Sequence, residues 1–185
     1  MPSGPGPIPE DLITEIVATV PKHIATFLLT SKQDAESIIA QLQKTKANTV
    51  QLVDSVTVDV YASLRKALPK ISIVQVIHVT DESSVQEAIA VSSFVDFILL
   101  DSGNPNLTVK ELGGTGRRHD WNLSRRIVES VNRPVFLAGG LNAENVSEAI
   151  ERVQPYGLDL CSGVRTNGKL DEEKLNRFFE LVNVY

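Results

Sequence analysis

The sequence predicts an α/β fold of the (β/α)8 barrel type, incomplete, with about six strands behind a leading helix. Short apolar runs alternate with amphipathic segments along the chain of 185 residues, which is typical of parallel βαβ units. The glycine-rich turns follow the last two predicted strands, where barrels commonly hold a phosphate. A doubly wound open sheet would instead carry its glycines in the first strand-to-helix turn. A complete barrel has eight strands, so the sequence predicts a deficit of roughly one β-α-β unit.

The first half of the chain predicts the leading helix and three strand–helix pairs. Prolines and glycines from Pro2 to Pro9 exclude a helix there, whereas Glu10 and Asp11 suit a first helical turn. The run at 71–79 is rich in the β-branched residues that strands favour. The predicted order is strand 24–29, helix 34–42, strand 50–53, helix 62–68, strand 71–79 and helix 84–90.

The second half continues the same alternation. The run at 95–100 is nearly all apolar, as expected of a strand that is covered on both faces. The following elements are predicted as helix 123–131, strand 135–137, helix 143–153, strand 158–160 and helix 172–182. Because no linker or low-complexity tract interrupts the series, we expect residues 1–185 to form one barrel domain.

Charge and composition exclude several functional classes. The formal net charge of −5 argues against a nucleic-acid partner, because phosphate backbones are bound by clustered Lys and Arg. A single cysteine excludes a disulfide framework and a multi-cysteine metal site. No apolar run approaches the roughly 20 residues that cross a bilayer, and the N-terminus shows no secretory signal pattern. We therefore expect a cytoplasmic protein with no metal and no membrane partner.

Glycine-rich turns and two acidic residues are the candidate site. Glycines let backbone N–H groups approach a phosphate, although tight turns of positive φ require them equally. Asp101 ends a predicted strand at the expected catalytic rim, where it either supports the glycine loop or contacts substrate. Asp120 is either a helix N-cap or a functional acid. The candidate phosphate-binding residues are Gly114, Gly116, Gly139, Gly140, Ser162 and Gly163.

From about Ile8 to Leu181 the chain resembles phosphoribosylanthranilate isomerase, the TIM-barrel enzyme of tryptophan biosynthesis. Four ordered segments carry the resemblance: Leu99-Leu100-Asp101-Ser102, Gly113-Gly114-Thr115-Gly116 with Asp120-Trp121, Leu137-Ala138-Gly139-Gly140-Leu141-Asn142 with Asn145-Val146, and Ser162-Gly163-Val164.

The resemblance implies an Amadori rearrangement by an intramolecular oxidoreductase that uses neither a metal nor an organic cofactor. The ligand would be a phosphorylated sugar, and the protein a monomer or a homodimer. Asp120 matches the family's general acid, which protonates the ribose ring oxygen so that the ring opens to a Schiff base. A carboxyl group serves that purpose when its surroundings keep a proton on it.

The chain also departs from the family pattern. The family's base is a cysteine in a Lys-Ile-Cys-Gly segment, which this sequence does not contain, and its only thiol, Cys161, is expected to be a small buried residue at a strand end. The family's arginine before its second helix has no counterpart in residues 5–8, and Val53 replaces a histidine.

Three explanations of these departures stay open at this stage. Met1 is an internal methionine, or a second chain supplies the missing strands. The third explanation is that the chain is a catalytically impaired paralogue that acts as a phosphosugar-binding or regulatory barrel.

Two residues beside Asp120 complete the expectations. We expect Trp121 to pack under the glycine loop. His119 either lines the site or lies exposed in the loop.

Overall fold

The computed structural model describes residues 7–104, 107, 112 and 116–184. Its main sheet has six strands, all parallel, and each strand is paired with the next one along the chain. The strands are β1 (Phe27–Thr30), β2 (Thr49–Leu52), β3 (Ser72–His78), β4 (Phe97–Asp101), β5 (Val135–Leu137) and β6 (Gly157–Leu158). This order and direction are those of a β/α barrel, as the alternating sequence pattern predicts.

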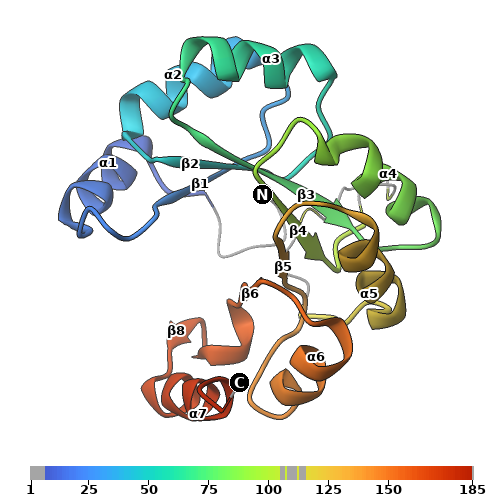
Figure 1. The fold of residues 1–185 in the computed structure, drawn as a ribbon. Helices are drawn as coiled ribbons and strands as arrows, with labels where there is room; N and C mark the ends of the chain where they lie inside the picture. The colour runs from blue at the N-terminus through green and yellow to red at the C-terminus, as the bar shows by residue number, and fades with distance from the viewer. Residues whose placement is uncertain (1–6, 105–106, 108–111, 113–115, 185) are drawn as a thin grey trace.

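Helices surround the curved sheet on its outer side (Figure 1). They are α1 (Glu10–Thr19), α2 (Ala35–Thr45), α3 (Val58–Ala67), α4 (Ser83–Ser92), α5 (Trp121–Ser130), α6 (Val146–Val153) and α7 (Glu172–Val182). Aspartates begin several of them: the Ser37 amide donates to the Asp34 carboxylate at 2.8 Å, and the Lys174 amide donates to Asp171 at 3.2 Å. Each such cap satisfies a backbone N–H that the helix itself leaves without a partner. No helix in the described ranges is long and apolar enough to cross a membrane.

Two apolar layers lie on opposite faces of the sheet. The outer layer packs strands against helices and includes the fully buried Ile38, Ile73 and Ile127. The inner layer faces the axis of the curved sheet and consists of Val53, Val74, Val76, Leu99, Leu112 and Ala138, with Phe97 and Phe136 against them. Burial on both faces explains why β4 is apolar up to its last residue, Asp101.

Most predicted elements are correct in kind but differ in their bounds. Four of the shifts are considered further: strand 24–29 is β1, helix 62–68 is α3, helix 143–153 is α6 and strand 158–160 is β6. Ile24 lies in a turn because its amide donates to the Pro21 carbonyl at 2.9 Å. Ahead of α6, the amides of Asn142 and Glu144 donate to the side chains of Asn145 and Asn142. These local bonds compete with helical ones and delay the start of α6.

The other two shifts have equally local causes. Helix α3 begins one turn earlier than predicted because Asp59 stabilises its first turn, where the backbone N–H groups carry a partial positive charge. Strand β6 is limited to Gly157 and Leu158, which are the residues that pair with β5. Beyond them the chain turns into a short 3-10 helix, η1 (Ser162–Val164).

A small antiparallel hairpin before α7 was not predicted from the sequence. Its strands are β7 (Arg165–Thr166) and β8 (Lys169–Leu170). Asn167 and Gly168 join them with φ values of 52° and 76°. An Asn-Gly pair is a strong signal of a two-residue hairpin turn, so the sequence at these two residues could have predicted the hairpin.

Candidate functional site

The carboxyl ends of β4, β5 and β6 meet at one rim of the sheet, because the strands are parallel. The Ala138 amide donates to the Leu100 carbonyl at 2.8 Å, and the Asp159 amide donates to the Leu137 carbonyl at 2.9 Å. These bonds extend the sheet ladder to the point where the glycine turns begin. Asp101, the last residue of β4, is buried at this rim. Active sites of β/α barrels are built at the same end of the strands.

The turn after β5 and the turn after β6 are in direct backbone contact. A Cβ atom on Gly163 would lie 1.9 Å from the carbonyl oxygen of Leu141, closer than any two such atoms approach. Only glycine therefore permits these two turns to pack together. Gly139 and Gly140 add φ values of 85° and 64°, which side chains rarely adopt.

The described end of the loop that carries Asp120 reaches the same place. A Cβ atom on Gly140 would lie 2.9 Å from the carbonyl oxygens of Gly116 and Arg117. A Cβ atom on Gly116, whose φ is 66°, would lie 3.6 Å from the hydroxyl oxygen of Ser162. The structure thus brings five of the six predicted phosphate-binding residues together, namely Gly116, Gly139, Gly140, Ser162 and Gly163. The sixth, Gly114, lies outside the described residues.

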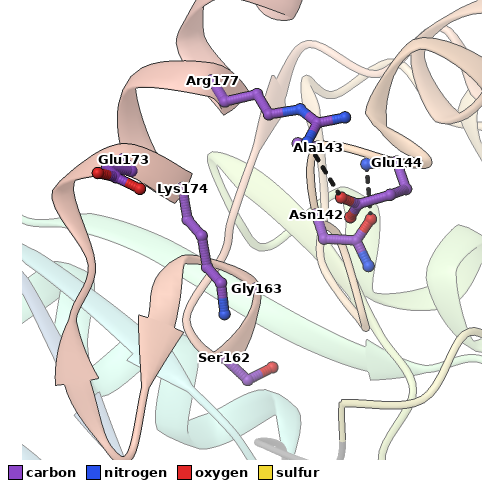
Figure 2. Close-up of a pocket in the computed structure, with 8 residues that line it drawn as sticks. All are labelled: Asn142, Ala143, Glu144, Ser162, Gly163, Glu173, Lys174 and Arg177. Atoms are coloured by element: carbon purple, nitrogen blue, oxygen red, sulfur yellow. Dashed lines mark hydrogen bonds and ion pairs between the residues drawn. The ribbon is translucent and has the colours of Figure 1, made fainter.

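A hollow of about 490 Å³ adjoins these turns on the side of α7 (Figure 2). Ser162 and Gly163 line it, together with Asn142, Ala143, Glu144, Glu173, Lys174 and Arg177. Its cationic groups already have partners: Arg177 lies 3.9 Å from Glu144, and Lys174 donates to the Arg165 carbonyl at 3.1 Å. Neither Asp101 nor Asp120 lines the hollow, so we place the candidate reaction at the rim.

Asp120 is exposed and serves as the N-cap of α5, where its Oδ1 accepts from the Asn122 amide at 2.8 Å. The N-cap role, which was one of the two alternatives for Asp120, is therefore present in the structure. It also sets the position of the carboxyl group, because the cap ties the side chain to the first turn of a rigid helix. The following residue, Trp121, is buried, and the Arg118 guanidinium lies 3.9 Å from the centroid of its ring. The glycines at 113 and 114, under which Trp121 was expected to pack, lie outside the described residues.

His119 lies largely inside the protein instead of in an exposed loop. Its Nε2 is hydrogen-bonded to the Ser124 hydroxyl oxygen at 2.7 Å, and its Nδ1 is buried with no hydrogen-bond partner among the described atoms. The Nδ1 lies 3.1 Å from where a Cβ on Gly139 would stand, so His119 packs against the turn after β5. Burial lowers the pKa of His119 to about 4, and the negative charge of Asp120 opposes this only in part.

This lowered pKa predicts a stability loss in mild acid. Between its ordinary pKa near 6.5 and about 4, the imidazole binds a proton in the unfolded chain but not in the folded one. The free energy of unfolding should therefore fall as the pH drops through this window, by up to about 3 kcal/mol from this residue. Urea denaturation at pH 7 and pH 4.5 measures the loss, which His119→Gln should reduce. The exposed His23 is the matched control, and an equal pH dependence in His119→Gln and His23→Gln would contradict the assignment.

Asp159 is a rim carboxyl that the sequence reasoning missed. It directly follows β6, as Asp101 ends β4. Partial removal from water and then the negative charge of Asp101 raise the pKa of Asp159. A carboxyl group that keeps its proton more readily is suited to proton transfer. The rule that selected Asp101, an acid at the carboxyl end of a strand, would also have selected Asp159.

The remaining predicted features are placed as follows. Cys161 is an exposed free thiol next to η1, so the expectation of a buried residue was wrong, because the chain leaves the sheet after Leu158. Val53 is buried in the inner apolar layer. Within the described part of the chain, no group of three or more His, Cys, Asp or Glu side chains is arranged to hold a metal ion.

Comparisons with known proteins agree with this geometry. The family described as "PRAI: N-(5'phosphoribosyl)anthranilate (PRA) isomerase" matches residues 9–181. The N-(5'-phosphoribosyl)anthranilate isomerase 2 of Methanosarcina mazei is 42% identical over 172 residues, which are 92% of this chain and 75% of that protein.

Solved structures are similar over nearly the whole chain. The phosphoribosyl anthranilate isomerase of Thermococcus kodakaraensis is 28% identical, with a TM-score of 0.76 over 95% of this chain and 81% of that one. A phosphoribosyl anthranilate isomerase in complex with reduced 1-(o-carboxyphenylamino)-1-deoxyribulose 5-phosphate is 24% identical, with a TM-score of 0.78 over 100% of this chain and 84% of that one. The latter comparison bears on the fold alone, and it confirms the predicted barrel class.

Proposed function

The chain belongs to the N-(5'-phosphoribosyl)anthranilate isomerase family, and we propose that its rim performs the family's rearrangement with Asp120 as general acid. The reaction converts N-(5'-phosphoribosyl)anthranilate into the 1-amino-1-deoxyribulose phosphate in tryptophan biosynthesis. One observation supports the assignment of the site: three glycine turns, distant in sequence, converge at the strand ends where Asp101 and Asp159 lie, and the loop that leads to Asp120 reaches the same turns.

The glycine turns are proposed to hold the substrate's phosphate. Gly139, Gly140 and Gly163 leave their backbone N–H groups unobstructed by side chains, and the start of η1 at Ser162 adds further backbone donors. Backbone N–H groups in such turns form concave sites that favour anions. The ligand class is therefore a phosphorylated sugar, gripped at the end remote from the reacting carbons. We further propose a cytoplasmic location, because a chain with a single cysteine suits a reducing compartment.

The carboxyl groups are proposed to divide the proton transfers. Asp120 gives its proton to the ribose oxygen, the bond from that oxygen to the anomeric carbon breaks, and the nitrogen lone pair forms the Schiff base. A general base then takes the C2 proton, which gives the enolamine. The enolamine becomes the ketone when its anomeric carbon gains a proton and its C2 hydroxyl loses one. Asp159, whose pKa is raised, keeps a second exchangeable proton near this rim. Asp101 is proposed as a support for the loop and turns, because it is buried.

The proposed phosphate grip predicts ligand binding that depends on the turn glycines. The chain should bind reduced 1-(o-carboxyphenylamino)-1-deoxyribulose 5-phosphate, with inorganic phosphate as a competitor. Gly140→Val should weaken binding by about tenfold or more, because its side chain would meet the backbone of Arg117 and require a strained positive φ. Calorimetric titration measures both effects.

The matched control for this titration is Gly168→Val. Gly168 shares the positive φ, but its added Cβ meets no atom within 4 Å. Unchanged affinity in Gly140→Val would mean that the turn glycines serve only the fold. Turnover of freshly generated substrate, followed through its fluorescence, tests the reaction itself. Binding without turnover in a folded chain would favour the phosphosugar-binding alternative.

A further inference from the structure

The segment that leads into α5 carries an arginine whose side chain folds back onto the helix. The Arg118 guanidinium lies 3.9 Å from the centroid of the Trp121 ring, within the range of a cation–π contact. The ring itself is held in place by packing, because Trp121 is only 2% exposed. Arg118 and Trp121 thus bracket Asp120, the proposed general acid, in the chain, and their side chains are in contact.

Arg118 is also bonded to the neighbouring helix. Helices α5 and α6 lie side by side (Figure 1). The Arg118 guanidinium reaches Glu148 in the first turn of α6, with a distance of 3.5 Å between Nη2 and Oε2. Glu148 is held in turn by Arg152, one helical turn further along α6, at 2.8 Å. The Arg118 side chain therefore joins the end of the loop to both helices.

Arg152 completes a charged network around the Trp121 ring. Its guanidinium lies 5.8 Å from the ring centroid and donates to the Asn122 side-chain oxygen at 3.2 Å. The hydrogen bond from Arg152 and the charge of Arg118 lower the pKa of Glu148, although partial desolvation opposes them. Its carboxylate therefore stays charged at neutral pH. Charges in a network hold their geometry better than an isolated surface ion pair, so the exposed Arg118 has a defined position.

Other bonds fasten this segment to its own helix. The N-cap bond of Asp120 ends on an amide of α5, and Nε2 of His119 is hydrogen-bonded to the Ser124 hydroxyl, also on α5. These bonds fix the segment relative to α5. Arg118 adds a bond to α6, the helix that follows the glycine turn after β5. It therefore connects the acid's segment with one of the proposed phosphate-binding turns.

A general acid is sensitive to small displacements, since a shift of about 1 Å can cost about 10²-fold in rate. Asp120 is exposed, so burial does not restrain its carboxyl group. We propose that Arg118 is a positioning residue for Asp120. It holds the segment against α6 through Trp121 and Glu148, so that the Asp120 carboxyl group keeps a fixed place relative to the glycine turns. Because Arg118 acts through Asp120, this role rests on the function proposed for that residue.

Direct contact of Arg118 with the substrate is the competing explanation. A guanidinium fork suits a carboxylate or a phosphate. The Arg118 guanidinium, however, already faces the Trp121 ring and the Glu148 carboxylate, which a ligand anion would have to displace. The two explanations differ in their kinetics, because loss of a substrate contact weakens binding, whereas loss of positioning lowers turnover.

Arg118→Ala should lower kcat by about tenfold or more. It should leave KM, and the affinity for reduced 1-(o-carboxyphenylamino)-1-deoxyribulose 5-phosphate, within about twofold. Arg118→Lys keeps the charge but stacks less well on an aromatic ring, so it should retain more turnover than Arg118→Ala. A loss of affinity with an unchanged kcat would make Arg118 a substrate contact and overturn the proposal.

The matched control is Arg126→Ala. Arg126 also lies on α5 and forms an ion pair with Glu82, the N-cap residue of α4, at 2.5 Å. The control removes a surface ion pair between helices but leaves the segment before α5 intact, so kcat should not change. An equal fall of kcat in both variants would contradict a specific role of Arg118. The two arginine side chains are 45% and 53% exposed, so circular dichroism should show the same folded content in both variants.

A double variant separates this role from the function of Asp120. If Arg118 acts through Asp120, Arg118→Ala should cost no further turnover in the Asp120→Asn background. Losses that multiply would show that Arg118 acts independently, against the proposal. Unchanged turnover in Asp120→Asn would contradict the function proposed for Asp120, and the positioning role with it. A loss in Asp120→Asn without one in Arg118→Ala would overturn the positioning role alone.

Trp121 provides a measurement that does not depend on activity. It is the only tryptophan in the sequence, so the tryptophan emission of the chain reports on its ring. Arg118→Ala uncovers one face of the ring, which should shift the emission to longer wavelength and increase its quenching by acrylamide. Arg126→Ala should change neither. Emission and quenching in Arg118→Ala identical to those of the parent chain would show that the stack is absent in solution, and would overturn the proposal.

Discussion

Asp120→Asn is expected to lower turnover of N-(5'-phosphoribosyl)anthranilate by about 10²–10⁴-fold, the usual contribution of a general acid. The amide has no carboxyl proton to give to the ribose oxygen. Its side-chain oxygen still accepts a bond from the Asn122 amide, and asparagine is as good an N-cap as aspartate. The substitution therefore separates the proposed chemical role from the structural one. Steady-state kinetics measures the loss of turnover, and urea denaturation measures any change in stability.

The control for this substitution is Asp171→Asn. Asp171 caps α7 in the same way, through the Lys174 amide, so both variants change a capping carboxylate into an amide. Turnover should fall only in Asp120→Asn, while binding of the reduced product analogue stays nearly constant. Equal turnover in Asp120→Asn and the parent chain would remove Asp120 from the mechanism. A comparable loss in Asp159→Asn alone would transfer the acid role to Asp159, whose pKa is raised.

Gly163→Ala is expected to reduce the free energy of unfolding by about 3 kcal/mol or more. The new methyl group would lie 1.9 Å from the carbonyl oxygen of Leu141, so one of the two turns must move. Because that oxygen belongs to the backbone, no side-chain rotation relieves the overlap. The same displacement should weaken binding of the phosphorylated product analogue, since both proposed phosphate-binding turns shift. Urea denaturation and calorimetric titration measure these effects.

Gly168→Ala is the matched control for the steric argument. Gly168 has a φ of 76°, but an added Cβ meets no atom within 4 Å. Its substitution should cost only the strain of a left-handed alanine, about 1–2 kcal/mol, and leave ligand binding unchanged. A smaller loss in Gly163→Ala than in Gly168→Ala would show that the two turns separate easily, against the rigid site described above.

The sequence by itself determined the fold class and the order of the main elements. Alternating apolar runs and amphipathic segments predicted six parallel strands with covering helices, and the strand at 135–137 and the helix at 172–182 were placed correctly to the residue. Both signals are local: a buried strand needs consecutive apolar residues, and a surface helix needs one apolar face. The ordered glycine turns identified the family for the same reason, since each turn requires glycine at its own position.

Only the tertiary structure decided which turns touch and which side chains are buried. The Gly163–Leu141 contact joins turns that follow different strands, so it depends on the curvature of the whole sheet. The sequence alone places His119 in a loop, and only the structure shows that Ser124 and Gly139 lie against its ring. The rise in the pKa of Asp159 likewise comes from its removal from water in the fold and then from the charge of Asp101, which is distant in sequence. Periodicity and glycine signals extend over a few residues, whereas distances between loops are set by how far the parallel strands curl around a common axis.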